Sequence, residues 1–448
     1  MNRSEVIFLL EQAEKKFHVD QWKFGDIEIW PIIKMDLFFQ WVNTSTNKAS
    51  KELKKESGSS KIYSTIKALS KYLSLFLRKP KIVNNIYCGT FSHRVDYDGL
   101  FINRYFEPLI EKDLSKTYIQ FEFDSRLNKS YKDPNKIVFT DDFKLPYSLL
   151  KVFLKKNILY APDLENFISL AQEKLNLPMN GFKNKLISRL QSIVTYSNLF
   201  KLLLSKHRPE KIFGLCYYST PMFALNYTAN KLGIPIFDMQ HGGQGRLHPM
   251  YNFQKIPVSG YNTLPKTFLC WDTTSRSNLQ SWLKNQTYHD AETVGNPWVD
   301  FQLNNNATIL SKEKKIILFT LQDTILPSYM LECIQDTPDT YHWWIRVHPR
   351  MTEAKSNIIK QLSERNISHK VEFDRAFEYS LPILLKQSVV HISRFSGSII
   401  ESALVNTPSI IIDEIGVETY RDYINDGLAV SVLSKNSKDL LDAILKFK

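Results

Sequence analysis

Residues 388–412 read SVVHISRFSGSIIESALVNTPSIII, with an apolar run, a Ser/Gly turn, a helical segment and a second apolar run. The pattern predicts a strand over Ser388–Ile392, a helix over 397–406 and a strand over Ser409–Ile412. Two strands joined through a helix in this order form a βαβ unit, in which the strands are parallel. The stretch therefore predicts an α/β protein built on parallel sheets.

The same alternation of apolar runs and helical segments extends over most of the chain, in two series separated by a Pro/Gly-rich passage near 260–310. The first series predicts strands at Ile82–Tyr87, Tyr118–Phe123, Lys211–Cys216, Ile234–Met239 and Thr267–Trp271; the second predicts strands at Lys315–Thr320, Trp343–Val347, Val371–Phe373, Ser388–Ile392 and Ser409–Ile412. Two such series predict two Rossmann-like domains, over residues 1–262 and 263–448. The N-terminal domain begins with a helical extension, and the polar, Ser/Lys-rich residues 44–62 predict a mobile loop.

Length and charge limit the class of protein. A chain of 448 residues fits two or three domains. Its 58 Lys and Arg against 46 Asp and Glu give a net charge of +12, which favours anionic ligands without choosing among them. No apolar run reaches the roughly 18 residues of a membrane span, and the N-terminus lacks a signal-peptide core. The four cysteines are widely spaced, so we expect a reduced, cytoplasmic protein.

A first candidate ligand site lies in the sequence Trp344–Arg350, which is a predicted strand ending in His-Pro. Ligands of open α/β sheets bind at the carboxyl ends of strands. His348 can donate a hydrogen bond to a phosphate oxygen, Pro349 ends the strand, and Arg346 adds positive charge. The alternative is a surface histidine in an ordinary strand–loop turn.

The turn after Ser388–Ile392 adds a second group of polar residues. Ser393, Ser396, Gly397 and Ser398 offer hydroxyl and backbone donors to an anion at the start of a helix, and Glu401 is positioned to accept from ribose hydroxyls. In the alternative interpretation Ser396 only caps the helix and Glu401 only interacts with the helix dipole. Because the His-Pro strand precedes this turn, we favour phosphate and ribose contacts.

Candidate catalytic bases lie in the predicted N-terminal domain. The sequence Cys88–Gly99 follows a strand and precedes a segment, Leu100–Ile110, that is expected to be helical. A group transfer to a hydroxyl needs a base that takes the proton of that hydroxyl, and we rank Asp98 first, then His93 and Asp96. An Asp-Gly pair is also a common turn sequence, so Asp98 has a purely structural alternative.

A further candidate base, His241, lies in a long loop over residues 240–262. This loop begins Gln240-His241-Gly242-Gly243 and contains Arg246, His248 and Tyr251. Glycines allow a backbone to approach a ligand closely, and two histidines with an arginine suit the recognition of an acceptor or a phosphate. Loops of this length are usually functional or disordered.

Taken together, His348-Pro349, the Ser-rich turn with Glu401, and Pro408–Asp413 resemble the donor domain of bacterial GT-B glycosyltransferases. The resemblance is greatest to enzymes that use CMP-activated acidic sugars, namely sialyltransferases and the Kdo and pseudaminic-acid transferases of capsule and lipopolysaccharide synthesis. It implies two Rossmann-like domains facing a central cleft, with acceptor bound N-terminally and the CMP phosphate bound by the His-Pro and Ser motifs. Gln240-His241-Gly242 is shared with CDP-glycerol polymerases, so CDP-glycerol or a UDP-sugar is the alternative donor. The acidic pair followed by glycine of several sialyltransferases is absent; Asp96–Gly99 only approaches it.

The resemblance implies an inverting enzyme that acts on a capsule or lipopolysaccharide oligosaccharide, lipid-linked at the inner face of the cytoplasmic membrane, where the protein would associate peripherally. Asp323, Asp374 and Asp413 stand singly, and none of them forms an Asp-x-Asp pair that could hold a metal on a nucleotide, so we expect a metal-independent reaction without a cofactor. The rival hypothesis is a basic protein that binds nucleic acid or anionic glycan. Against it, Lys and Arg are spread along the chain and no nucleic-acid-binding motif occurs, so we expect no nucleic-acid partner.

Overall fold

The computed structural model describes residues 2–45, 80–143, 157–305, 314–347 and 351–447. These residues divide into two compact units. The first comprises Met1–His241, His248–Cys270 and Arg276–Val294, and the second comprises Gly242–Leu247, Trp271–Ser275 and Gly295–Lys448. Each unit contains one parallel β-sheet with helices packed on it, which confirms the predicted α/β class with two Rossmann-like domains.

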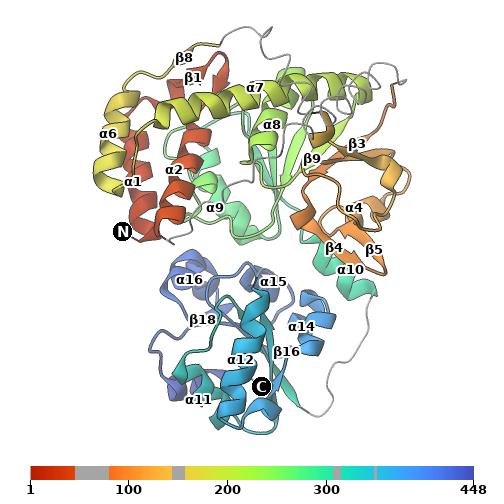
Figure 1. The fold of residues 1–448 in the computed structure, drawn as a ribbon, viewed down its shortest axis with the longest axis vertical. Helices are drawn as coiled ribbons and strands as arrows, with labels where there is room; N and C mark the ends of the chain where they lie inside the picture. The colour runs from red at the N-terminus through yellow and green to blue at the C-terminus, as the bar shows by residue number, and fades with distance from the viewer. Residues whose placement is uncertain (1, 46–79, 144–156, 306–313, 348–350, 448) are drawn as a thin grey trace, which may run out of the picture. The chain divides into compact units, whose positions relative to one another are not determined.

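The sheet of the first unit has seven parallel strands in the order β12-β11-β10-β9-β3-β6-β7 (Figure 1). Their bounds are β3 Asn85–Gly89, β6 Tyr118–Glu122, β7 Ile137–Phe139, β9 Lys211–Gly214, β10 Ile236–Met239, β11 Thr267–Cys270 and β12 Asp290–Thr293. In chain order, β3 is the first strand of this sheet. β6 and then β7 are added on one side of β3, and β9 follows on its other side. The strand order therefore reverses between β3 and β9, and ligands of open α/β sheets bind at such a point.

The first unit extends beyond the boundary at residue 262 that the sequence predicts. Strands β11 and β12 continue the first sheet, because β10 pairs in parallel with β11 and β11 with β12. Helix α9, Thr273–Leu283, connects these two strands. The Pro/Gly-rich passage hides this continuation in the sequence, since β12 contains only one buried residue, Ala291.

The sheet of the second unit has six parallel strands in the order β15-β14-β13-β16-β17-β18. Their bounds are β13 Lys315–Leu321, β14 Tyr341–Val347, β15 Val371–Glu372, β16 Ser388–Ser393, β17 Ser409–Ile411 and β18 Ala429–Ser431. The strand order reverses between β13 and β16, as in a dinucleotide-binding Rossmann fold. The packed helices are α10 Pro297–Asn305, α11 Ser328–Asp336, α12 Thr352–Glu364, α13 Asp374–Glu378, α14 Leu381–Gln387, α15 Ser398–Leu404, α16 Glu414–Thr419, α17 Arg421–Asn425 and α18 Ser437–Leu445.

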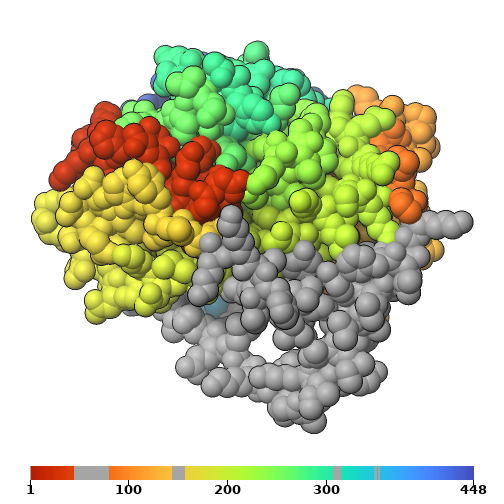
Figure 2. Space-filling view, turned by 90° about the horizontal axis from the view of Figure 1, so that it is seen from above, coloured from red at the N-terminus to blue at the C-terminus, as the bar shows by residue number. Residues whose placement is uncertain are grey.

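The predicted helical extension of the first unit is present as α1, Arg3–Lys16, and α2, Trp30–Ser45. It packs beside α6, Leu164–Leu175, as the red and yellow atoms of Figure 2 show. The rings of Trp22, Trp30 and Phe167 meet edge to face, with centroids 5.4–5.9 Å apart. Most of the loop expected over 44–62 lies outside the described residues.

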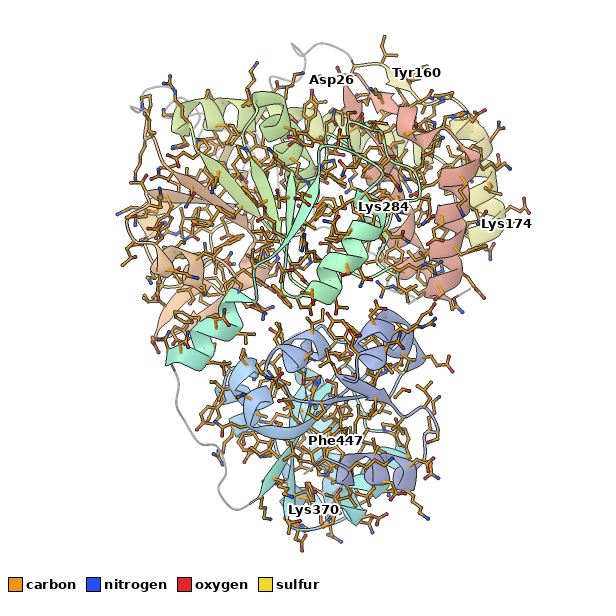
Figure 3. The ribbon with its side chains drawn as sticks, turned by 180° about the vertical axis from the view of Figure 1, so that it is seen from behind. Asp26, Tyr160, Lys174, Lys284, Lys370 and Phe447 are labelled. Carbon is orange, nitrogen blue, oxygen red and sulfur yellow. The ribbon has the colours of Figure 1, made fainter. Side chains whose placement is uncertain are left out.

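A small antiparallel sheet of β1, Lys23–Phe24, β2, Ile27–Glu28, and β8, Leu159–Tyr160, joins this extension to α6. Asp26 and Tyr160 mark the sheet in Figure 3. Two long helices, α7, Phe182–His207, and α8, Thr220–Leu232, pack on each other in the same unit. Among the described residues, no helix is long and apolar enough to cross a membrane.

The helix expected over Leu100–Ile110 is wrong in its first half. Residues Arg94–Tyr97 form β4 and Leu100–Asn103 form β5, which pair as an antiparallel hairpin before the short helix α4, Glu107–Lys112. The turn residues Asp98 and Gly99 both have positive φ, 49° and 75°, as a tight hairpin turn requires. The Asp-Gly pair therefore marks this turn.

Candidate active site

Side chains from three strand ends meet where the order of the first sheet reverses. His93 follows β3, Cys216 follows β9 and His241 follows β10. The Cys216 Sγ atom lies 3.1 Å from His241 Nε2 and 3.6 Å from His93 Nε2. The hydroxyl of Tyr218 lies 3.0 Å from the same His241 Nε2. The structure thus brings together two of the predicted bases and adds a thiol and a phenol.

Burial keeps this group of side chains uncharged at neutral pH. Burial lowers the pKa of His93 to about 3, helped by nearby His241, Arg104 and Arg94. Burial also lowers the pKa of His241 to about 4, and the positive charge of Arg104 acts in the same direction. The pKa of the Cys216 thiol is raised to about 12, mainly by burial and then by the charge of Asp238. Neutral imidazoles are proton acceptors, so the group is suited to base catalysis.

Asp238 of β10 holds the turn that contains Cys216 and Tyr218. This fully buried carboxylate accepts from the Tyr217 backbone N–H at 3.1 Å and from the Tyr251 hydroxyl at 3.3 Å. Tyr251 in turn packs against the ring of His248, with centroids 4.8 Å apart, and His248 lies 5.3 Å from Tyr218. The 240–262 loop therefore contributes an ordered wall of rings to the site.

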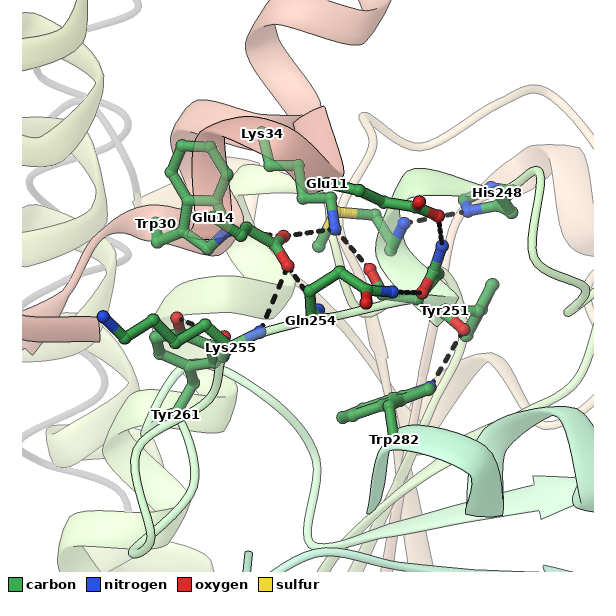
Figure 4. Close-up of polar contacts among 12 residues, drawn as sticks. Glu11, Glu14, Trp30, Lys34, His248, Tyr251, Gln254, Lys255, Tyr261 and Trp282 are labelled. Atoms are coloured by element: carbon green, nitrogen blue, oxygen red, sulfur yellow. Dashed lines mark hydrogen bonds and ion pairs between the residues drawn. The ribbon is translucent and has the colours of Figure 1, made fainter. Parts of the chain in front are cut away.

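The N-terminal helices hold that loop in place through a buried ion pair (Figure 4). Lys34 Nζ lies 2.6 Å from Glu14 Oε1 with both side chains at most 1% exposed, and it also donates to the Asn252 carbonyl. Glu14 accepts from the backbone N–H groups of Gln254 and Lys255. Burial lowers the Lys34 pKa, and the charge of Glu14 opposes that shift.

Asp98 and Asp96 lie away from this group of side chains. Because Tyr97 pairs with Leu100 and Arg94 with Asn103, Asp98 is at the turn of the hairpin and His93 precedes its open end. The four residues of β4 lie between them, and these five residue steps span about 16 Å along the hairpin. Asp98 is exposed, and Asp96 forms a surface ion pair with Lys129 at 2.8 Å.

A cavity of about 650 Å³ in the first unit opens beside the same sheet edge. Asp124 lines it and also accepts from the Phe91 backbone N–H, 2.9 Å away, in the turn that leads to His93. The walls combine aromatic rings, hydroxyls and charges of both signs: Phe123, Tyr196, Ser188, Ser192, Thr220, Pro221, Asp124, Asp141, Lys185 and Arg189. Such a mixture suits a polyhydroxylated ligand, which presents both apolar ring faces and hydrogen-bonding groups.

The second unit places two of the predicted phosphate-binding hydroxyls inside the protein. Thr320, at the end of β13, lies 3.0 Å from both Ser393 Oγ and Ser398 Oγ and 2.9 Å from His391 Nε2. The other ring nitrogen of His391 lies 2.9 Å from Ser409 Oγ. Burial alone lowers the pKa of His391 to about 3. This network joins β13, β16 and β17, and the strand order reverses between the first two of these strands.

The partly exposed residues of the same turn are Ser396, Gly397 and Glu401. Ser396 Oγ accepts from the Ser398 backbone N–H at 3.3 Å, while the residue that caps α15 is Gly397, with no side-chain capping bond. Glu401 Oε1 lies 3.5 Å from the side-chain amide of Asn296. A side chain at Gly397 would lie 3.5 Å from the Cα of Gly242, an ordinary van der Waals contact within the second unit.

Arg346, which the sequence predicts to add positive charge to the phosphate site, and Arg394 of the Ser-rich turn both have partners inside the protein. Arg346 donates to the carbonyls of Ala376 and Tyr379 at 2.7 and 2.6 Å. Arg394 pairs with Asp323 and Asp413, each at 2.6 Å. His348 and Pro349 lie outside the described residues. Within those residues, no group of three or more His, Cys, Asp or Glu side chains is arranged to hold a metal ion.

Sequence reasoning missed Cys216, Tyr218, Thr320 and His391. Lys211–Cys216 was interpreted as one strand, but β9 ends at Gly214 and Cys216 adopts a left-handed conformation with φ of 53°. The following Ser219-Thr220-Pro221 is a helix start, with Ser219 capping α8. Had that cap been used to end the strand earlier, Cys216 would have been placed at the ligand-binding edge.

No protein-family model matches the sequence, and a search of curated proteins finds no match. Solved structures resemble the chain at low identity. UDP-GlcNAc 2-epimerase from Neisseria meningitidis, bound to UDP-GlcNAc, is 12% identical with a TM-score of 0.45, covering 81% of this chain and 91% of that one. UDP-GlcNAc 2-epimerase from Methanocaldococcus jannaschii is 13% identical with a TM-score of 0.47, covering 81% of this chain and 92% of that one. MurG from Acinetobacter baumannii is 9% identical with a TM-score of 0.41, covering 81% of this chain and 90% of that one. These values are too low to transfer a function, so we infer function from the side chains of this protein.

Proposed function

We propose that this protein is a glycosyltransferase that moves a sugar from a nucleotide donor to an acceptor hydroxyl. One observation supports this above others: both parallel sheets place polar residues at the edge where the strand order reverses, and the two sets differ in chemistry. The first set consists of neutral proton acceptors and donors around Cys216. The second consists of hydroxyls, glycine and a carboxylate around Ser396 and Glu401.

The second unit is the proposed donor site. Ser396 and the backbone of Gly397 would contact the phosphate, together with His348-Pro349 at the end of β14. Glu401, oriented by Asn296, would accept from the ribose hydroxyls. The Ser393 and Ser398 hydroxyls would act indirectly, because their bonds to Thr320 fix the shape of the turn.

The first unit is the proposed acceptor site, with His241 as the base. Its Nε2 atom would take the proton of the acceptor hydroxyl while that oxygen bonds to the anomeric carbon. The bond from that carbon to the phosphate oxygen breaks, and the phosphate leaves with the electron pair, so the configuration inverts. The cavity beside Asp124 would hold the acceptor sugar. We propose no metal for this reaction.

The donor proposed from the sequence is a CMP-linked acidic sugar such as a nonulosonic acid or Kdo. The partners found for Arg346 and Arg394 favour a second candidate, a UDP-sugar or another donor without a carboxylate, because both arginines already neutralise or bind groups of the protein. A lipid-linked capsule or lipopolysaccharide oligosaccharide remains the proposed acceptor, with peripheral association at the inner face of the cytoplasmic membrane.

A nucleotide panel tests the proposal. Ligand binding to the native state raises the melting temperature. A ligand concentration one hundred times Kd adds about 2.7 kcal/mol to the free energy of unfolding. Stabilisation by CMP supports the acidic-sugar donor, and stabilisation by UDP supports the second candidate. His348→Ala and Glu401→Gln should both reduce the shift without lowering the melting temperature of the free protein. If no nucleotide stabilises the protein, and it binds nucleic acid with a steep salt dependence, the transferase assignment is wrong.

A further inference from the structure

The Cys216 backbone adopts a conformation that is unfavourable for a residue with a side chain. Its φ of 53° lies in the left-handed region, which costs a non-glycine residue about 1 kcal/mol or more. Only side-chain contacts distinguish cysteine from glycine here, and the thiol lies between two imidazole nitrogens, 3.1 and 3.6 Å away. In this left-handed backbone conformation the Cys216 thiol lies between His93 and His241.

The hydrogen bond at the far side of His93 fixes its tautomer. The Thr90 backbone N–H donates to His93 Nδ1 at 3.2 Å. A backbone N–H can only donate, so Nδ1 must present its lone pair and a neutral His93 must hold its proton on Nε2. That N–H faces the Cys216 sulfur, which acts as the acceptor.

His241 requires the opposite tautomer. Its Nε2 faces the Cys216 thiol and the Tyr218 hydroxyl, whose pKa values burial raises, so both groups hold their protons and can donate. When one of them donates to the single lone pair of Nε2, the ring proton lies on Nδ1, a buried atom for which the described residues offer no hydrogen bond of ordinary geometry, although the backbone of Met239 raises the pKa of His241. The other charged or titratable groups that act on this set of residues are Arg94, Arg104, Asp238 and His248.

We propose that Cys216 is a positioning residue that holds His93 and His241 in opposite neutral tautomers, with the basic lone pair of His241 on Nε2. The Tyr218 hydroxyl occupies the position that a substrate hydroxyl takes when it donates to this nitrogen. The catalytic consequence rests on the proposed function, but the tautomers themselves do not. Cysteine serves here because its sulfur accepts from one ring while its hydrogen is directed to the other.

Histidine-selective ¹⁵N NMR of the full chain tests the tautomers directly. In the wild type we expect His93 protonated on Nε2 and His241 on Nδ1. Cys216→Ala combined with Tyr218→Phe, which removes both donors to Nε2, should leave His241 as a mixture of both tautomers, whereas Cys216→Ser combined with Tyr218→Phe should preserve the wild-type pattern, because a hydroxyl also accepts and donates. Cys88→Ala, which removes a buried thiol from β3, is the matched control and should change neither ring. Identical tautomers in the two wild-type histidines, or an unchanged His241 in Cys216→Ala combined with Tyr218→Phe, would overturn the inference.

Turnover separates this inference from the proposed function. If the protein transfers a sugar, Cys216→Ala should lower kcat by up to about 100-fold with little change in KM and shift the acidic limb of the pH profile of kcat/KM. Cys216→Ser should recover most of kcat. Expected tautomers in a protein that transfers no sugar would disprove only the function. Turnover and a pH profile that Cys216→Ala leaves unchanged would disprove the positioning role.

Discussion

The side-chain amide of Asn296 lies 3.5 Å from Glu401 Oε1, so the residue that precedes α10 contacts the first turn of α15. Asn296 Oδ1 also accepts from the Trp298 backbone N–H at 3.0 Å, which fixes the direction of the amide. The capping bond thereby orients the carboxylate proposed to bind ribose. Two segments 105 residues apart in the chain thus form one polar surface within the second unit.

Glu401→Gln should weaken nucleotide binding by roughly 10–100-fold, because a hydrogen bond to a charged group contributes about 1.5–3 kcal/mol. Stability should be nearly unchanged, since Glu401 is half-exposed. Titration calorimetry with the nucleotide that stabilises the wild type measures the effect. Glu364→Gln, an exposed glutamate of α12, is the control and should bind normally. Equal affinity of Glu401→Gln and the wild type would exclude the ribose contact.

His241→Asn should lower kcat/KM by about 10²–10⁴, the usual contribution of a general base. Asp98→Asn should leave it within about twofold of the wild type, because Asp98 lies in an exposed turn and asparagine tolerates positive φ. Steady-state kinetics with the identified donor compare the two variants. A large loss in Asp98→Asn with normal turnover in His241→Asn would reverse the assignment of the base.

His391 should make the stability of the second unit depend on acid. Its pKa is lowered from 6.5 to about 3 in the folded protein, so between these values the unfolded chain binds a proton that the native state does not. Stability present above pH 6.5 is therefore lost as the pH falls toward 3. Urea unfolding at pH 6 and pH 5 gives the change in the free energy of unfolding with pH. In His391→Gln this pH dependence should be smaller than in the wild type, by up to about 1.4 kcal/mol per pH unit. His369→Gln, at an exposed position of the same unit, should retain the wild-type slope.

Lys34→Met should destabilise the first unit by about 3–5 kcal/mol, because it leaves the Glu14 carboxylate buried without its counter-charge. Adding Glu14→Gln should restore much of the loss. Denaturant unfolding of the two single variants and the double variant gives the coupling energy. Removing the exposed pair Lys183–Glu165 by the same scheme should cost no more than about 1 kcal/mol. Additive effects at Lys34 and Glu14 would contradict the coupling.

The architecture was predictable because the strands are apolar and the helices between them are long. β13 and β16, for example, lie within a residue or two of their predicted positions. The hairpin of β4 and β5 was not predictable from the sequence. Its residues follow a strand and precede the helix α4, and their apolar positions fit a strand as well as a helix. β12 escaped prediction because it forms the sheet edge and has one buried residue.

The candidate site was only half predictable for a different reason. His93, His241 and Glu401 were selected by residue type and by their place after strands, which the sequence reveals. The roles of Ser393 and Ser398 depend on which face of the chain turns inward, and a single buried partner, Thr320, decides that. Cys216 becomes a site residue only through a backbone conformation that no composition or spacing predicts.

The bonds of Glu14 also bear on how the protein is made. Its ion-pair partner, Lys34, emerges from the ribosome soon after it, but the backbone groups of Gln254 and Lys255 follow about 240 residues later. Until then the Glu14 carboxylate lacks two of the backbone donors that satisfy it in the folded protein. The first unit therefore completes this set of contacts only after more than half of the chain has been translated.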